Sequence, residues 1–131
     1  MVATPTPEQE QIASEENLAV MATARKDGSA QLTPINYAYV KGKFLISTTK
    51  DRVKYHNVKR NPKVSLCIIR KDWRPYVTVY GSARIEEGDV ATGTAEIFKR
   101  MSDRPVPDNF AEVLKEQRRV LIILTPERFT P

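Results

Sequence analysis

Residues 18–48, LAVMATARKDGSAQLTPINYAYVKGKFLIST, decide the fold class of this chain. Three runs typical of strands, Leu18–Thr23, Ala30–Val40 and Phe44–Thr48, follow one another with few residues between them. The Asp-Gly pair at 27–28 and the Lys-Gly-Lys stretch at 41–43 predict tight turns. Strands joined by turns this short pair antiparallel, and they argue against a doubly wound nucleotide fold, whose strands need helical crossovers.

The rest of the chain predicts three more strands and four helices. Thr6-Pro7 starts a helix to about Glu16, and Asp51 caps a helix over residues 52–60 that Asn61-Pro62 ends. Six mostly antiparallel strands with helices set aside predict an α+β fold built on a small barrel. The other predicted elements are strands Val64–Ile69, Tyr76–Ile85 and Val120–Leu124, the last stopped by Pro126, a helix opened by Gly88-Asp89 and a helix capped by Asp108.

Length and composition narrow the class of protein further. The 131 residues predict one domain, 1–131, with a loose terminus over residues 1–5. The first twenty residues are polar and acidic and the apolar runs are short, so we expect no signal peptide, no membrane span and a cytoplasmic protein. A single cysteine, Cys67, expected in the core, and a single histidine, His56, exclude an internal disulfide and a structural zinc site.

The strongest candidate site is the stretch from Ser47 to Lys54, STTKDRVK. Its two leading hydroxyls end a predicted strand, and its basic residues Arg52 and Lys54 open a predicted helix, whose free N–H groups favour a phosphate. The net charge of +5 also favours an anionic partner. The alternative is a solvated basic turn, in which the Asp51 carboxylate occupies the same N–H groups.

Two further features are candidate parts of a pocket. Pro34 lies within a predicted strand, and because proline cannot donate to a sheet ladder it marks an edge or a bulge. The freed backbone could face a planar ligand beside Thr33 and Asn36, or the proline could simply protect an edge strand from aggregation. Trp73, in a polar turn, is either a pocket wall or part of an association surface.

Four segments together resemble the pyridoxamine-phosphate-oxidase-like split-barrel family. They are Thr33-Pro34-Ile35-Asn36, then Ser47-Thr48 with Arg52-Val53-Lys54, then residues 57–66 (NVKRNPKVSL), and the closing residues 125–129 (TPERF). The resemblance spans roughly residues 12 to 129. Within the family, the chain is most similar to small proteins classed as deazaflavin (coenzyme F420)-dependent oxidoreductases.

The resemblance implies a six-stranded antiparallel split β-barrel with peripheral helices that forms a homodimer. It also implies that a flavin or deazaflavin binds in a groove at the subunit interface. By resemblance, the cofactor phosphate would lie near Ser47, Thr48, Arg52 and Lys54, and the ring system would lie along Thr33, Pro34, Ile35 and Asn36. Trp73 would shape a pocket for a small-molecule substrate.

The leading functional hypothesis is therefore an oxidoreductase that moves a hydride from reduced coenzyme F420 to a small organic substrate. The cofactor would do the chemistry, and no side chain can be singled out as a catalytic acid or base. FMN is the alternative cofactor, but the six basic residues within 50–63 favour a deazaflavin, whose oligoglutamate tail needs positive surface beyond one phosphate. A barrel that binds a cofactor, another anion or nucleic acid without catalysis is the other alternative, with nucleic acid disfavoured because the tyrosines and the positive charge lie on different elements.

Overall fold

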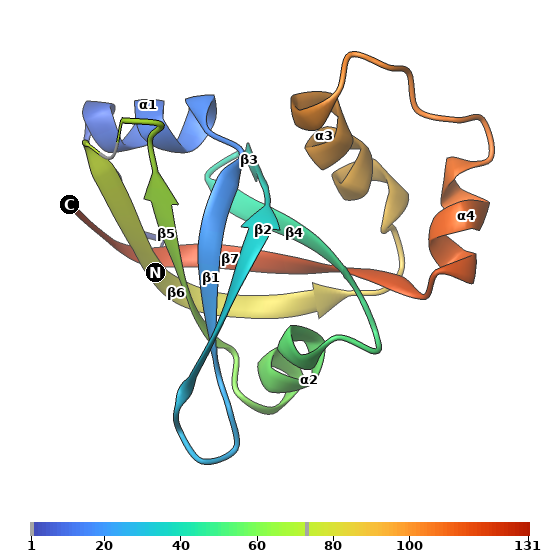
Figure 1. Cartoon of the computed structure of the whole chain (residues 1–131), viewed down its shortest axis with the longest axis horizontal. Helices are drawn as coiled ribbons and strands as arrows, with labels where there is room; N and C mark the ends of the chain where they lie inside the picture. The colour runs from blue at the N-terminus through green and yellow to red at the C-terminus, as the bar shows by residue number, and fades with distance from the viewer. Residues whose placement is uncertain (1, 73) are drawn as a thin grey trace.

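A computed structural model describes residues 2–72 and 74–131 of the chain (Figure 1), so the predicted pocket residue Trp73 lies outside the described residues. Its elements are α1 (Pro7–Glu15), β1 (Leu18–Ala24), β2 (Ala30–Asn36), β3 (Ala38–Val40), β4 (Lys43–Thr49), α2 (Val53–Arg60), β5 (Lys63–Ile69), β6 (Tyr76–Glu86), α3 (Ala91–Met101), α4 (Phe110–Glu116) and β7 (Arg119–Thr130). None of the helices in these two stretches is long and apolar enough to cross a bilayer.

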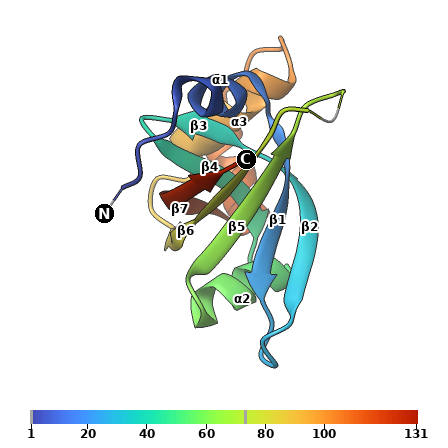
Figure 2. The same ribbon diagram turned by 90° about the vertical axis from the view of Figure 1, so that its left-hand side faces the viewer.

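The strands form one antiparallel sheet in the order β2-β1-β5-β6-β7-β4-β3. β2 and β3 are the two edges of this sheet, yet Tyr37 alone separates them in the chain. The sheet must therefore curl until its edges approach each other, which makes the open barrel of Figure 2. The predicted α+β antiparallel barrel is confirmed. Its strands number seven instead of six, because the predicted strand Ala30–Val40 breaks at Tyr37.

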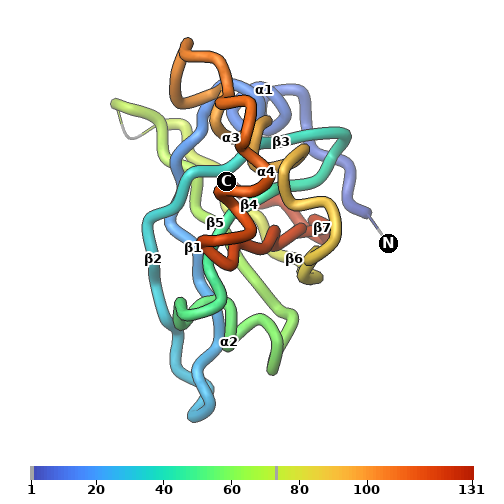
Figure 3. The backbone as a smooth tube through the Cα atoms, turned by 90° about the vertical axis from the view of Figure 1, so that its right-hand side faces the viewer, coloured from blue at the N-terminus to red at the C-terminus, as the bar shows by residue number. Residues whose placement is uncertain are grey.

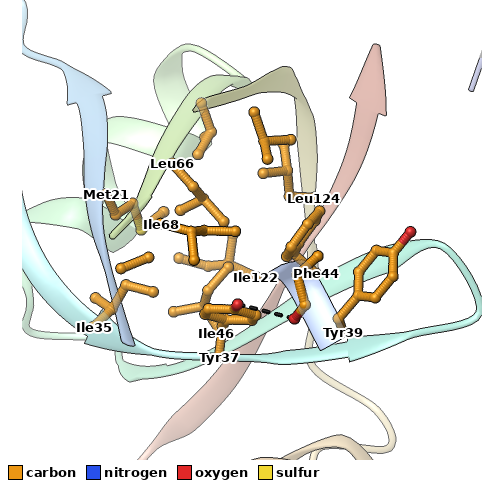
Figure 4. Close-up of a cluster of buried hydrophobic side chains, with 14 of the residues drawn as sticks. Met21, Ile35, Tyr37, Tyr39, Phe44, Ile46, Leu66, Ile68, Ile122 and Leu124 are labelled. Atoms are coloured by element: carbon orange, nitrogen blue, oxygen red, sulfur yellow. Dashed lines mark hydrogen bonds between the residues drawn. The ribbon is translucent and has the colours of Figure 1, made fainter. Parts of the chain in front are cut away.

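Tyr37 is fully buried at this corner and is held by both its backbone and its side chain. Its N–H donates to the carbonyl of Asn17 at 2.9 Å, and its hydroxyl donates to the carbonyl of Ala13 in α1, also at 2.9 Å (Figure 4). The ring packs against Phe44 with 5.4 Å between centroids. Burial raises the pKa of the Tyr37 hydroxyl well above its ordinary value, so the group remains a donor. The corner thus links both sheet edges to α1.

The interior of the barrel is filled by alternate residues of its strands, as a sheet with one buried face requires. In β6, Val77, Val79, Gly81 and Ala83 are buried, and the residues between them are exposed or half-buried. The largest buried side chains meet near the corner and include Phe44, Leu66, Ile68, Ile122 and Leu124 (Figure 4).

The helices cover the ends and one side of the barrel (Figure 1). α1 lies across one end and begins at the predicted cap, with Thr6 and Gln9 forming a capping box. α2 lies at the opposite end and stops before Pro62 as predicted. α3 and α4 pack outside the barrel beside β4, in front of it in Figure 3.

Two predicted helix caps are wrong. α2 has Arg52 at its N-cap and no side-chain cap, because the carboxylate of Asp51 accepts from the Thr49 hydroxyl instead. α4 begins at Phe110 after an Asn109 N-cap, again without a side-chain bond, so Asp108 does not cap it. The Asp51 carboxylate, which was predicted to cap α2, therefore does not bond to the N–H groups at the start of this helix.

The last strand is longer than predicted. β7 does not stop at Pro126 but continues to Thr130, with a register shift where Gly81 faces Pro126. A bulge accommodates the proline, which has no N–H for the ladder. A side chain at Gly81 would collide with the carbonyl oxygen of Thr125, so the close approach here requires glycine. The Pro126 carbonyl also accepts from the N–H of Ala3, which ties the start of the chain to β7.

Cys67 is not in the core. Because Val64, Leu66 and Ile68 point into the barrel, Cys67 between them lies on the outer face of β5, where it is partly exposed. An apolar run can fill both faces of a strand without both faces being buried.

The corner at Tyr37 yields a stability prediction. Tyr37→Phe should lower the free energy of unfolding by about 1–3 kcal/mol, because it leaves the buried Ala13 carbonyl without its donor. Tyr39→Phe is the matched control: its hydroxyl donates to the exposed Glu10 carboxylate, which water can solvate, so the loss should be smaller. Urea unfolding of the three proteins measures both values. Equal losses would show that the buried Tyr37 hydrogen bond stabilises the fold no more than the exposed Tyr39 hydrogen bond does.

Candidate functional site

A cavity of about 500 Å³ opens where β2 and β4 diverge. These two strands approach each other at the closure of the barrel but share no ladder, since β2 pairs only with β1, and β4 pairs with β3 and β7. α2, α3, α4 and the start of β7 complete the walls. All eight residues proposed from the sequence to contact a cofactor line this one cavity: Thr33, Pro34, Ile35, Asn36, Ser47, Thr48, Arg52 and Lys54.

The β2 wall follows from the edge position of that strand. Pro34 faces Val20 of β1, and β2 is an edge strand of the sheet, which is one of the two positions, an edge or a bulge, that the proline predicted. The β4 wall carries Ser47, Thr48 and Thr49. The gap between the unpaired edge of β2 and the part of β4 that lies beyond its pairing with β3 thus places backbone groups and hydroxyls around a space large enough for a cofactor ring.

One end of the cavity is cationic. Arg52, Lys54 and Arg119 all line it, and within residues 2–72 and 74–131 none of the three forms an ion pair. Arg119 instead donates to the Ser47 hydroxyl at 3.3 Å and to the Gln117 side chain at 2.7 Å. The described lining contains no Asp or Glu. Three cations without a counterion form a site for an anion such as phosphate.

The environment of Lys54 supports this interpretation. Burial, together with the neighbouring charges of Arg52 and Arg119, lowers the pKa of the Lys54 ammonium below its ordinary value. Cations that repel one another in the free protein are stabilised when an anion binds among them. The bare start of α2, which has no side-chain cap, adds the positive end of a helix dipole.

The opposite wall is apolar and comes from α3 and α4. Phe98 and Phe110 face each other with ring centroids 6.2 Å apart, so the two helices meet along the cavity rim. α3 lies close to the barrel because Gly93 packs directly on Leu121 of β7, where a Cβ would collide. The remaining apolar lining is Ile97, Met101, Val113 and Leu114.

Sequence reasoning missed Arg119 and the whole α3–α4 wall. Arg119 is distant in sequence from Arg52, and only the β4–β7 pairing, Thr49 opposite Arg119, brings them together. The sequence predicted the helices that became α3 and α4 but not which surface they would cover. No local signal in the sequence identified the partner.

The basic side chains of segment 50–63 do not form one continuous positive surface. Lys50 pairs with Glu87 at 2.9 Å, Lys59 lies over the Tyr55 ring, and Arg60 donates to the Ala24 carbonyl. Only Arg52 and Lys54 of this segment line the cavity. The positive charge beyond the cavity comes instead from the α4–β7 junction.

Two hollows at that junction are contiguous with the cavity. One, of about 400 Å³, shares Thr49, Arg52 and Gln117 with it and is also lined by Arg118 and Asp51. The other, of about 560 Å³, shares Leu114 and Arg119 and is also lined by Arg118, Lys115, Asp89 and the paired Lys50 and Glu87. In both hollows the cationic side chains outnumber the acidic ones, so the surface beyond the cavity is net positive.

The fold and this cavity define a small α+β protein built on a split antiparallel barrel. The chain belongs to the pyridoxamine 5'-phosphate oxidase family, whose sequence pattern matches residues 5–130. The expected family membership is confirmed.

Solved structures agree with this assignment. A protein named F420 reductase is 26% identical, with a TM-score of 0.77 over 97% of this chain and 98% of its own. A conserved hypothetical protein from Mycobacterium tuberculosis is 21% identical, with a TM-score of 0.82 over 98% of this chain and 84% of its own. A heme binding protein from Mycobacterium smegmatis is 18% identical, with a TM-score of 0.72 over 98% of this chain and 54% of its own. The last two show the fold alone.

The lowered pKa of Lys54 predicts a pH dependence. A bound anion favours charged Lys54, so affinity for inorganic phosphate should be full at neutral pH and fall as the pH rises through the lowered pKa, below 10.5. In Lys54→Arg the charge persists, so affinity should fall much less over the same rise in pH. Calorimetric titration with phosphate measures both proteins. The same decline in the two would show that Lys54 does not hold the anion.

Proposed function

We propose that the cavity binds coenzyme F420 and that the protein is an oxidoreductase that reduces a small organic substrate. The observation that carries this proposal is the pairing, within one cavity, of an unpaired cationic cluster with an apolar wall. A phosphorylated ring cofactor has the matching pair of properties, an anionic end and a planar apolar body.

The residues have distinct proposed roles. Arg52, Lys54 and Arg119 would bind the phosphate, with Ser47 and Thr48 as hydroxyl partners. The β2 residues Thr33, Pro34, Ile35 and Asn36 would lie along the ring system, and the α3–α4 wall would exclude water from it. The reduced cofactor would supply the hydride, so the side chains bind and orient instead of reacting.

Two features favour a deazaflavin over FMN. The cationic hollows at Arg118 and Lys115 extend the positive charge beyond a single phosphate, as an oligoglutamate tail requires. The F420 reductase among the solved structures also spans nearly the same length of chain. FMN remains the alternative, because the cavity itself needs only one phosphate to match its cations, and a barrel that binds a cofactor without turnover is the other alternative.

Binding tests the cofactor. Absorbance and fluorescence titrations should show tighter binding of F420 than of FMN. Lys54→Ala should weaken F420 binding roughly tenfold to a hundredfold, the value of one charge-assisted contact, without lowering the melting temperature. Lys59→Ala, on the same helix but outside the cavity lining, is the matched control and should change little.

Each possible result has a distinct meaning. A clear preference for FMN would reverse the cofactor assignment. Equal effects of Lys54→Ala and Lys59→Ala would place the phosphate elsewhere. If F420 binds but reduces none of a panel of small oxidised substrates, the protein is a cofactor carrier.

We also propose that the protein is a homodimer. No helix covers the outer face of β2, β1 and β5 in Figure 2. Cross-strand pairing places Leu32, Ile69, Tyr76 and Tyr80 on this outer face, each between 40% and 64% exposed. An exposed face that gathers several large apolar side chains is typical of an association surface. Pro34 belongs to the same face and also lines the cavity, so a partner on this face would lie beside the cofactor.

Oligomeric state tests this proposal. Light scattering at micromolar concentration should give about twice the 14.9 kDa mass of the chain. Leu32→Glu should give a monomer, because it places a charge within the apolar face. Val2→Glu, at a residue of similar exposure outside that face, should remain dimeric. A monomeric wild type would remove the proposed interface.

A further inference from the structure

A chain of side-chain hydrogen bonds runs from α2 through the β1–β2 hairpin to the cavity. Arg60 donates to Asn57 Oδ1 at 2.8 Å, and Asn57 Nδ2 donates to Thr23 Oγ1 at 3.1 Å. The Thr23 hydroxyl donates to Gln31 Oε1 at 3.2 Å, and Gln31 Nε2 donates to Thr33 Oγ1 at 2.6 Å. Thr33 lines the cavity, whereas the other four do not. We call this series the Arg60–Thr33 relay.

The direction of the relay begins at its first member. Arginine can only donate, so Arg60 holds the oxygen of the Asn57 amide toward itself and directs the nitrogen to Thr23. Thr23 accepts that bond, and its own proton goes to the Gln31 oxygen. The Gln31 nitrogen, on the other side of that amide, donates to Thr33. The charge of Arg60 thus orients the Asn57 amide, and the bonds beyond it run in the same direction.

Burial makes this orientation rigid. Asn57 is 4% exposed and Thr23 is 3% exposed, so neither can exchange its partners for water at low cost. Arg60 is held in place by a second bond, from the same nitrogen to the Ala24 carbonyl at 2.8 Å. Reversing the Asn57 amide would point its nitrogen at the Arg60 guanidinium, so two donors would face each other.

The end of the relay determines what Thr33 can do. Its oxygen accepts from Gln31, and among the described residues no hydrogen bond takes up its proton. We propose that the Thr33 hydroxyl donates this proton to the ligand, with Gln31 and Asn57 as positioning residues that set its direction. The matching ligand atom is an acceptor, a carbonyl oxygen or an unprotonated ring nitrogen.

This inference deepens the proposed function and rests on it for the identity of the ligand, because flavin and deazaflavin rings both carry carbonyl oxygens. The relay itself does not depend on the ligand. α2 anchors the relay through Asn57 and Arg60 and lines the cationic end through Lys54. One helix therefore positions both the proposed phosphate contact and the proposed ring contact.

The ligand-free protein tests the direction of the relay. In NMR spectra, the Gln31 Nε2 protons should show nuclear Overhauser effects to the Thr33 methyl group, and the Asn57 Nδ2 protons to the Thr23 methyl group. The Gln31 protons close to Thr23 instead would mean the opposite direction and would overturn the inference.

Binding variants test its consequence. Thr33→Val removes the donor and should weaken F420 or FMN binding roughly threefold to tenfold, the value of one hydrogen bond, while Thr33→Ser should restore it. Gln31→Glu keeps the size of the side chain but replaces its donor with a second acceptor. The Thr33 proton then turns from the cavity to the carboxylate, so binding should weaken by a similar factor although Gln31 does not line the cavity.

The double variant separates the relay from a simple charge effect. Once Thr33→Val has removed the donor, adding Gln31→Glu should weaken binding less than about twofold further, since coupled residues are not additive. Full additivity would mean that the new carboxylate acts through its charge, and unchanged binding in Gln31→Glu would also overturn the inference. If the wild type binds neither F420 nor FMN, the proposed function fails, and the NMR contacts still decide the relay.

Discussion

The single-residue link between the two edges of the sheet is the constraint on which the rest of the structure depends. Because Tyr37 alone joins β2 to β3, the seven strands must curl into a barrel. The buried hydrogen bond from its hydroxyl to α1 holds that corner in place. β2 and β4, the strand paired with β3, approach each other without pairing, and the cavity opens between them. The Tyr37 link therefore determines both how the barrel closes and where the cavity lies.

The cavity joins chemically different walls that come from distant parts of the chain. β4, α2 and β7 supply hydroxyls and three cations, and α3 and α4 supply an apolar surface. α2 serves both ends, with Lys54 in the cationic cluster and Asn57 in the relay to Thr33. The ligand that we propose for this cavity combines an anionic group with an apolar ring that presents an acceptor.

Local patterns in the sequence predicted most of the elements and the part of the cavity lining that comes from β2, β4 and the start of α2. Turn residues and strand composition predicted the antiparallel barrel, and Pro34 predicted an edge strand, because these depend on neighbouring residues. The break at Tyr37 was missed because both halves of residues 30–40 have strand composition. Arg119 and the α3–α4 wall were missed because only strand pairing and helix packing bring them to the cavity. The caps at Asp51 and Asp108 failed because other contacts replaced them.

The most direct test of the central claim, that a phosphorylated ring cofactor lies between β2 and β4, is a titration of ¹⁵N-labelled protein with F420, followed by amide chemical shifts. The account predicts that the largest changes fall on Thr33, Asn36, Ser47, Lys54 and Arg119, which come together only in this cavity. Changes confined to the outer face around Ile69 and Tyr76, or no changes at saturating cofactor, would contradict it.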